Sequence, residues 1–179
     1  MHRAITRKYE GVADKNLFDQ VSKIFLNNYA TNIFVKSEIY PNVKETLREL
    51  KNRRIYLGCV TNKPHKFAIS LLRAADLFKY FPIIVGGDSL SNKKPNPEPI
   101  NYAIAKVGVQ KESTTMIGDS ITDLDAAKNA GVRSICVSYG YSGDVDLSTH
   151  NPDKIINSMA ELPKAIMSLS IGSNKLGRY

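Results

Sequence analysis

The chain has 179 residues, a length that suits one domain or one domain with a small appendage. Hydrophobic residues make up 42% and charged residues 23%, as in ordinary globular proteins, and no apolar run approaches the roughly 20 residues of a membrane span. The formal net charge of +8 would suit a nucleic-acid partner. However, the basic residues are scattered and form no stripe interleaved with aromatic residues, so the composition argues against that class and favours a solvated surface.

The N-terminus and the two cysteines indicate the cellular compartment. Residues 1–10 are basic and lack the apolar core of a signal peptide, so we expect a cytoplasmic protein. Cys59 and Cys136 fall inside predicted strands and lack the spacing of metal ligands. We interpret both as reduced, buried, small hydrophobic residues.

Two helices precede the first predicted strand. Apolar side chains recur at helical spacing over 16–29 and predict an amphipathic helix. Pro41 begins a second helix, which ends near Arg53. A boundary is predicted near residues 37–41, which separates a small unit over 1–38 from a main domain over 39–179.

Short apolar runs then alternate with helical patterns. The runs predict strands over 55–60, 81–85, 114–117 and 134–137, with a last short one at 155–156. A closing helix is predicted over 159–169, followed by a frayed polar tail over 170–179. Fully apolar strands that alternate with helices indicate an α/β fold, with a Rossmann-like parallel sheet covered by helices on both faces.

Ligands of such sheets gather at the carboxyl ends of the strands, where this chain carries Thr61, Asp88, Asp119 and Ser138. Asp119 follows a predicted strand, and Asp123 lies in the first turn of the next helix, as expected for a site that binds a hard cation. An alternative is a capping box made by Ser120 and Asp123. Because that alternative does not account for Asp119, we favour the metal interpretation.

The turn over 61–64 offers a hydroxyl from Thr61, an amide from Asn62 and a following helix N-terminus, which together suit a phosphate group. Taken alone, the turn is better explained as an ordinary N-cap followed by proline.

Alternating prolines stiffen the loop over 93–99 and hold Lys94 in one place. A held ammonium can neutralise a phosphoryl group or a neighbouring carboxylate. The loop can equally be a rigid linker that begins a helix at Pro97 or Pro99.

In combination and in this order, the pieces resemble the second, third and fourth motifs of the haloacid dehalogenase-like phosphatases. Further details resemble the phosphoglycolate phosphatase branch, and the resemblance covers residues 18–169. The residues that carry it are Val60-Thr61-Asn62-Lys63-Pro64, Gly86-Gly87-Asp88-Ser89, Lys93-Lys94-Pro95-Asn96-Pro97, Gly118-Asp119-Ser120 with Asp123, and Tyr139-Gly140-Tyr141.

The chain departs from that family in one respect. Family members open with a strand that ends in Asp-x-Asp-Gly-Thr, in which the first Asp is the nucleophile and the second is the general acid and base. This sequence contains no such segment. Asp144-Val145-Asp146 has the spacing, but it follows the last core strand and continues with Leu147 instead of Gly. The resemblance therefore implies that 1–38 is a remnant of a helical cap and that 39–179 is a core without its first, central strand.

The resemblance implies a Mg²⁺-dependent, two-step hydrolysis of small phosphorylated acids through an aspartyl-phosphate. Asp119 would hold the metal directly and Asp123 indirectly. Thr61, with Asn62 beside it, would bind the phosphoryl oxygens. Lys94 would pair with the nucleophile and the phosphoryl group. Most of the catalysis would then be electrostatic positioning.

Two classes of function follow from these motifs. The first is an enzyme of the phosphoglycolate phosphatase type, which acts on a small phosphorylated metabolite and is inactive alone because the nucleophile is absent. The alternative is a non-catalytic relative or decayed fragment that binds phosphate or Mg²⁺ without turnover. In either case we expect no membrane partner, and we expect instability or self-association through strands that lack their neighbour.

Overall fold

The computed structural model describes Thr6 and residues 11–140 and 146–173, and it divides the chain into two compact units, Met1–Glu38 and Ile39–Tyr179. The first unit contains α2 (Lys15–Thr31), which extends slightly beyond the predicted helix at both ends. Asp14 caps this helix by accepting a hydrogen bond from the backbone N–H of Leu17 at 3.1 Å. No side chain of α2 is buried, and the identity of this unit as a cap remnant stays a prediction.

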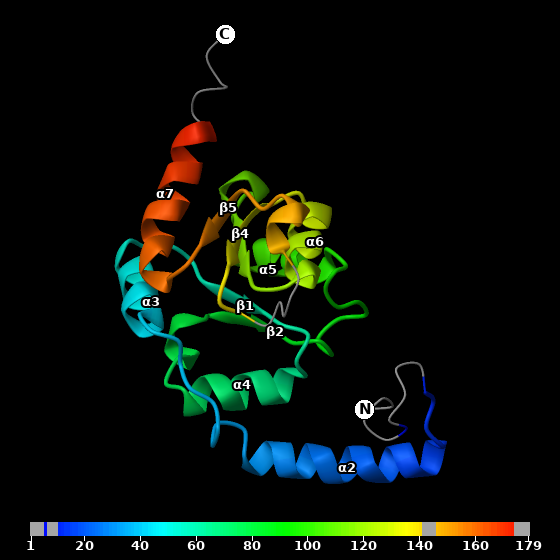
Figure 1. Cartoon of the computed structure of the whole chain (residues 1–179). Helices are drawn as coiled ribbons and strands as arrows, with labels where there is room; N and C mark the ends of the chain where they lie inside the picture. Colours follow the sequence, from blue (N-terminus) through cyan, green and yellow to red (C-terminus); the bar gives the residue numbers. More distant parts are fainter. Residues whose placement is uncertain (1–5, 7–10, 141–145, 174–179) are drawn as a thin grey trace. The chain divides into compact units, whose positions relative to one another are not determined.

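The described residues of the second unit form five short strands, each preceded or followed by a helix, and Figure 1 shows how they are arranged. All strand pairs are parallel, which confirms the predicted α/β fold. The strands begin and end within three residues of the predicted runs. They are β1 (Gly58–Val60), β2 (Ile83–Val85), β3 (Thr115–Gly118), β4 (Arg133–Val137) and β5 (Lys154–Ile156).

The helices of the second unit connect and cover these strands. They are α3 (Val43–Asn52), α4 (His65–Ala74), α5 (Glu98–Val107), α6 (Ile121–Ala130) and α7 (Leu162–Ser173). The predicted closing helix is wrong in detail, because Met159–Glu161 forms a 3-10 turn, after which α7 runs on to Ser173. The expected frayed tail therefore starts at least four residues too early, and residues 174–179 lie outside the described part. None of the described helices has the length and apolar character needed to cross a membrane.

Two helical layers enclose the strands. Figure 1 shows α3 and α7 together on one side and α5 and α6 on the other. The first layer buries Leu50, Leu162 and Ala165 against Ile135 and Ile156. The second layer is built around Ile100, Ala126, Ala127, Ala130 and Val132. Because side chains alternate along a strand, β4 sends Ile135 into the first core and Cys136 toward α6.

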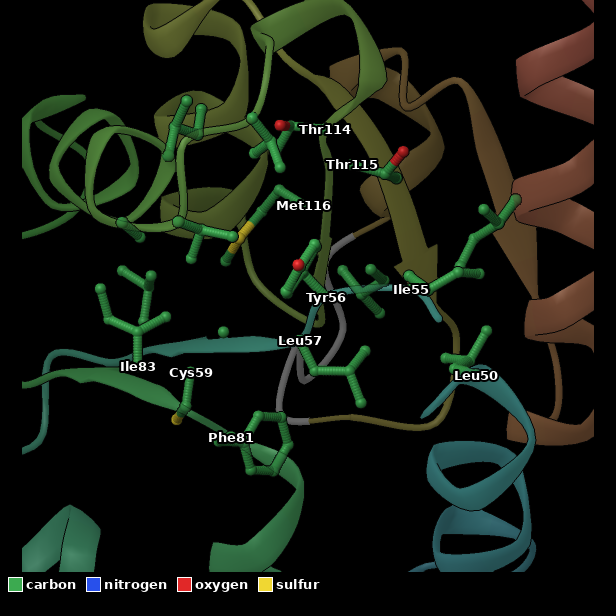
Figure 2. Close-up of a pocket in the computed structure, with 18 of the residues that line it drawn as sticks. Leu50, Ile55, Tyr56, Leu57, Cys59, Phe81, Ile83, Thr114, Thr115 and Met116 are labelled. Atoms are coloured by element: carbon green, nitrogen blue, oxygen red, sulfur yellow. The ribbon is translucent and has the colours of Figure 1, made fainter. Parts of the chain in front are cut away.

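The strands do not form one continuous sheet. Within the described residues, β1 and β2 form one sheet, and β3, β4 and β5 form another. Each sheet therefore has an edge strand, β1 or β3, that faces the interior of the unit. A cavity of about 560 Å³ is lined by residues of both edge strands (Figure 2). This gap lies at the position where the family resemblance expects a central strand.

Candidate functional site

The predicted site residues gather at the carboxyl ends of β1 and β3, and Lys94 connects them. Its ammonium Nζ donates a 2.7 Å hydrogen bond to the carbonyl of Val60, the last residue of β1. The same atom lies 2.6 Å from Oδ1 of Asp123, in the first turn of α6. The side chain of Lys94 is only 8% exposed. A single buried cation therefore joins the ends of two strands that belong to different sheets.

The loop that carries Lys94 is fastened on both sides. The side-chain amide of Asn62 donates to the carbonyl of Lys94 at 2.8 Å, and the amide of Asn129 donates to the carbonyl of Pro95 at 3.0 Å. The Lys94–Pro95 peptide bond is cis. These contacts support the prediction that the proline-rich loop holds its lysine in one place. They also show that Asn62, predicted to contact phosphate, positions the loop through its amide nitrogen.

Asp123 uses both of its carboxylate oxygens inside the protein. Oδ1 accepts a hydrogen bond from the ammonium of Lys94. Oδ2 accepts hydrogen bonds from the Ser120 hydroxyl at 2.8 Å and from the backbone N–H of Asp119 at 3.2 Å. Ser120 in turn caps α6 by accepting from the N–H of Asp123 at 3.3 Å. The Ser120 cap of the alternative interpretation is therefore present, together with the ion pair, but the box is incomplete because Asp123 accepts the backbone N–H of Asp119 and not that of Ser120.

The surroundings of Asp123 favour its charged form. Burial alone raises the pKa of this carboxyl. The positive charge of Lys94 lowers it, as do the hydrogen bonds from Lys94, the Ser120 hydroxyl and the Asp119 backbone, and together these effects outweigh burial. The pKa of Asp123 therefore lies below its ordinary value. An ionised Asp123 fixes both the lysine ammonium and the backbone at Asp119, so its geometry suits positioning more than direct metal binding.

Asp119 follows β3 directly and lies at the mouth of α6, as predicted. Its side chain packs against Gly140, where a Cβ atom would overlap the Asp119 carboxylate. Only glycine permits this close approach of the 138–140 turn, and the sequence did not identify that role. Gly118 stands in the same relation to the side chain of Asp123.

The described residues fit a magnesium ion in part. They contain no group of three histidine, cysteine or acidic side chains placed to hold a metal. Mg²⁺ commonly takes one or two protein carboxylates and completes its shell with water and substrate phosphate. Asp119, at the mouth of α6, can supply one such carboxylate, and both oxygens of Asp123 accept hydrogen bonds within the protein.

The turn after β1 differs from the predicted cap. Thr61 donates its N–H to the Val85 carbonyl at 2.9 Å, and its hydroxyl accepts from the N–H of Lys63 at 3.2 Å. Neither Thr61 nor Asn62 caps α4, whose N-cap residue is Pro64. Instead, the carboxylate of Asp88 accepts the N–H of His65 at 2.6 Å, across 23 positions of sequence.

Asp88 belongs to a second network that the sequence analysis missed. Ser89 accepts the N–H of Gly86 at 2.9 Å, and its hydroxyl lies 3.3 Å from Nδ1 of His65. A Cβ atom at Gly86 would overlap the His65 backbone. The Gly-Gly-Asp-Ser segment therefore holds the start of α4 against the end of β2. The two adjacent glycines were the available signal, because glycine allows backbones to approach closely.

The two cysteines lie in strands as predicted, but only one of them is buried. Both carry free thiols, and Cys136 is buried while Cys59 is half-buried. Burial raises the pKa of the Cys59 thiol, although the nearby charge of Lys94 opposes this effect. Burial and the carboxylates of Asp119 and Asp123 raise the pKa of Cys136. Thiols with raised pKa values are poor nucleophiles at neutral pH.

Comparison with known proteins agrees with this arrangement. The family model described as haloacid dehalogenase-like hydrolase matches residues 2–137. A phosphoglycolate phosphatase of Nitrosococcus oceani is 40% identical over 160 residues, which cover 89% of this chain and 71% of that protein. Among several such relatives the chain spans from 51% to 74% of their length.

Solved structures show the same fold. The crystal structure of a predicted phosphoglycolate phosphatase from Haemophilus somnus superposes with a TM-score of 0.83 and 34% identity, over 87% of this chain and 69% of that one. CbbY from Rhodobacter sphaeroides, solved in complex with phosphate, gives a TM-score of 0.73 and 25% identity over 87% of this chain and 70% of its own. The family match, the relatives and the shared fold together place this chain among the haloacid dehalogenase-like hydrolases, as a phosphatase of the phosphoglycolate phosphatase-like branch.

Proposed function

We propose that this chain carries the phosphate-binding and charge-neutralising part of a Mg²⁺-dependent phosphatase that acts on small phosphorylated acids. The observation that carries the proposal is the position of the Lys94 ammonium, held between the Val60 carbonyl and Asp123. Thr61 follows Val60, and the backbone of Asp119 is bound by the same carboxylate. A cation, a hydroxyl and a carboxylate thus converge at the carboxyl ends of β1 and β3, where ligands of parallel sheets bind.

Each residue has a distinct proposed task. The Thr61 hydroxyl binds phosphoryl oxygens together with the second N–H of the Asn62 amide, whose first N–H holds the Lys94 carbonyl. Lys94 neutralises the negative charge of these oxygens through its remaining donor capacity. Asp123 keeps Lys94 charged and in place, because removal of that carboxylate leaves a buried cation without its partner. When bound, Mg²⁺ would supply Lewis-acid stabilisation of the phosphoryl group, with Asp119 as its ligand in this chain. CbbY, which has the same fold, was solved in complex with phosphate, and this supports phosphate as the group that the site recognises.

The attacking carboxylate is proposed to come from outside this sequence. The chain contains no Asp-x-Asp-Gly-Thr, and Asp119 and Asp123 are assigned to metal binding and positioning. In the segment Asp144-Val145-Asp146-Leu147, residues 144 and 145 lie outside the described residues. We therefore propose that the chain alone does not hydrolyse phosphomonoesters, since positioning without a nucleophile leaves little of a two-step path.

The test measures binding and turnover separately. Inorganic phosphate and Mg²⁺ are titrated into the native chain by calorimetry, and hydrolysis of phosphoglycolate and p-nitrophenyl phosphate is assayed with Mg²⁺. We expect phosphate binding that Lys94→Ala weakens and that the surface variant Lys79→Ala leaves unchanged, with no turnover. Turnover that Asp119→Ala abolishes would contradict the assignment of the nucleophile. Absence of phosphate binding would contradict the proposed site.

A further inference from the structure

The 138–140 turn, which follows β4, supports the carboxylate of Asp119 from one side. Gly140 lies so close to Asp119 that an added Cβ atom would overlap both the Cβ atom and the carboxylate of that residue. The position of Gly140 therefore decides how much room the Asp119 side chain has. Since Asp119 follows β3 and the turn follows β4, this support comes from outside β3 and α6.

The neighbouring strand β5 fixes the first residue of the turn, Ser138. Its N–H donates to the carbonyl of Ile156 at 3.1 Å, and its hydroxyl donates to Oδ1 of Asn157 at 2.7 Å. Asn157 is held in turn, because its own N–H donates to the Glu161 carboxylate at 3.2 Å. These bonds hold the beginning of the turn, whereas Gly140 lies two residues further along the chain.

The ring of Tyr139, next to Gly140, has a support of its own. It packs against the ring of Tyr40, with the two centroids 5.0 Å apart and the planes at 61°. This is the edge-to-face arrangement that aromatic pairs prefer. The hydroxyl of Tyr139 is buried and has no hydrogen-bond partner among the described residues. The ring, and not the hydroxyl, therefore makes the contact that holds Tyr139.

Tyr40 stands on a backbone that is itself anchored. Two residues further on, the side-chain amide of Asn42 donates to the hydroxyl of Ser158 at 3.3 Å. Near the start of α3, the buried Thr46 donates its hydroxyl to the carbonyl of Met159 at 2.9 Å. Both bonds fasten the beginning of α3 to the segment after β5. The ring of Tyr40 is thus a fixed support against which Tyr139 rests.

We propose that Tyr40 is a positioning residue for Asp119. Tyr40 holds the ring of Tyr139, and Tyr139 fixes the adjacent Gly140, which limits where the Asp119 carboxylate can lie. Residues that support a ligand in this way orient it for the metal. Tyr40 lies just after the boundary between the two compact units, far in sequence from both motifs that it supports. The metal-binding role of Asp119 rests on the proposed function, but the contacts that lead from Tyr40 to Asp119 do not.

The first test observes Asp119 without any metal. The side-chain carboxyl carbon of Asp119 is followed by NMR in the native chain, and its resonance is assigned by its loss in Asp119→Asn. We expect Tyr40→Leu to shift or broaden this resonance, because the turn loses its support. Tyr40→Phe should leave it unchanged, because the ring remains. An unchanged Asp119 resonance in Tyr40→Leu would overturn the proposal.

Tyr102→Leu is the matched control. Tyr102 lies on α5 and is 39% exposed, close to the 44% of Tyr40, and its ring also has a neighbour, the ammonium of Lys106 at 5.4 Å. We expect this variant to leave the Asp119 resonance unchanged. An equal change in Tyr40→Leu and Tyr102→Leu would overturn the proposal, because a general loosening of the fold would then be the cause.

The second test measures Mg²⁺ binding by calorimetry. We expect Tyr40→Leu to weaken binding about two- to tenfold, the range for loss of one aromatic pair, and Tyr40→Phe and Tyr102→Leu to bind as the native chain does. Native affinity in Tyr40→Leu would overturn the proposal. A native chain that binds no Mg²⁺ would instead contradict the proposed function, and the Asp119 resonance alone would then decide on Tyr40.

A double variant shows whether Tyr40 acts through the turn. Gly140→Ala displaces the Asp119 carboxylate directly, since the new Cβ atom overlaps it. Addition of Tyr40→Leu to Gly140→Ala should therefore change the Asp119 resonance less than Tyr40→Leu does in the native chain. Effects of the two substitutions that are independent of each other would overturn the proposal, because Tyr40 would then reach Asp119 by another route.

Discussion

The ammonium of Lys94 lies 2.6 Å from the carboxylate of Asp123, and the two residues connect the sheet of β1 to the sheet of β3. Both side chains are less than 10% exposed. A buried pair of this kind contributes little relative to an apolar replacement of both partners, but loss of one partner leaves an uncompensated charge. The pair is therefore both a candidate functional element and a sensitive point for stability.

Lys94→Met should lower the free energy of unfolding by about 3–5 kcal/mol, because Asp123 would remain buried without its cation. The double variant Lys94→Met/Asp123→Asn should recover part of that loss. Urea denaturation of the four proteins of this double-mutant cycle measures the coupling between the two residues. Lys79→Met, which removes the exposed 2.8 Å pair with Asp76, serves as the control and should be close to the native chain. If the losses of unfolding free energy in the two single variants simply add up in the double variant, the two residues are not coupled.

The stability contributed by Asp123 should disappear in acid. Its folded-state pKa lies below the unfolded value of about 3.9, so the contribution is fully present above that pH and is lost as pH falls through the folded-state pKa. The difference in unfolding free energy between the native chain and Asp123→Asn should therefore narrow as the pH is lowered below about 4. Urea titrations at a series of pH values test this, and a difference that stays constant down to pH 2 would show that the pKa of Asp123 is not lowered in the folded state.

Gly140→Ala should impair metal binding by displacing the Asp119 carboxylate, because the new Cβ atom overlaps it. We expect Mg²⁺ affinity to fall about 10–100-fold, the range for a lost residue that supports a ligand. The measurement is the rise in melting temperature with added Mg²⁺, which Asp119→Asn should abolish. Gly108→Ala is the matched control: it strains a positive φ of 73° but has open space around it, so it should reduce stability and leave the Mg²⁺ response intact.

Addition of a segment with Asp-x-Asp-Gly-Thr should produce phosphatase activity that depends on Lys94 and Asp119. In that protein Lys94→Ala should lower kcat by about a hundredfold or more, as for loss of one preorganised charge contact at a reacting group. Steady-state hydrolysis of phosphoglycolate measures this effect. Near-normal kcat in the Lys94→Ala variant would show that Lys94 does not contribute to catalysis. If the protein with the added segment binds phosphate and Mg²⁺ but shows no turnover, the non-catalytic alternative is favoured.

Amide hydrogen exchange should alternate along the two interior edges. The N–H groups of Gly58, Val60, Thr115 and Ile117 face the cavity, whereas those of Cys59 and Met116 face a paired strand. In the native chain, the first set should exchange about tenfold faster or more than the second. Uniform protection in a monomer with a sharp unfolding transition would show that the gap has closed, and would contradict the expected instability.

The sequence predicted the elements better than their assembly. Every predicted strand is present, because an apolar run between turn residues reports local burial, but the division into two sheets depends on which strands find partners. The same distinction holds at the site. Asp119 and Lys94 were identified from motifs, and the Ser120 cap from its spacing. The loop was expected to place Lys94 near a carboxylate, but its pairing with Asp123 across 29 positions is set only by folding.

Residues that act through close packing were the hardest to predict. Gly140 and Asp88 lie in segments that carry the family resemblance, but their roles depend on segments that approach from elsewhere in the chain. Asn62 was assigned to phosphate because amides often bind anions, yet its nitrogen holds the Lys94 carbonyl. Such assignments need a structure, because the sequence alone does not show which of several possible partners a side chain contacts.

The separation of the two sheets has a consequence for folding. One sheet is built from the contiguous stretch 58–85 and the other from 115–156, so each ladder closes only short loops and can form without the other. Fast local closure favours two folding nuclei over one. Equilibrium unfolding is then not required to be a single cooperative transition. A calorimetric enthalpy larger than the van't Hoff enthalpy would indicate that the two sheets unfold separately. Joining the sheets would turn two cooperative units into one.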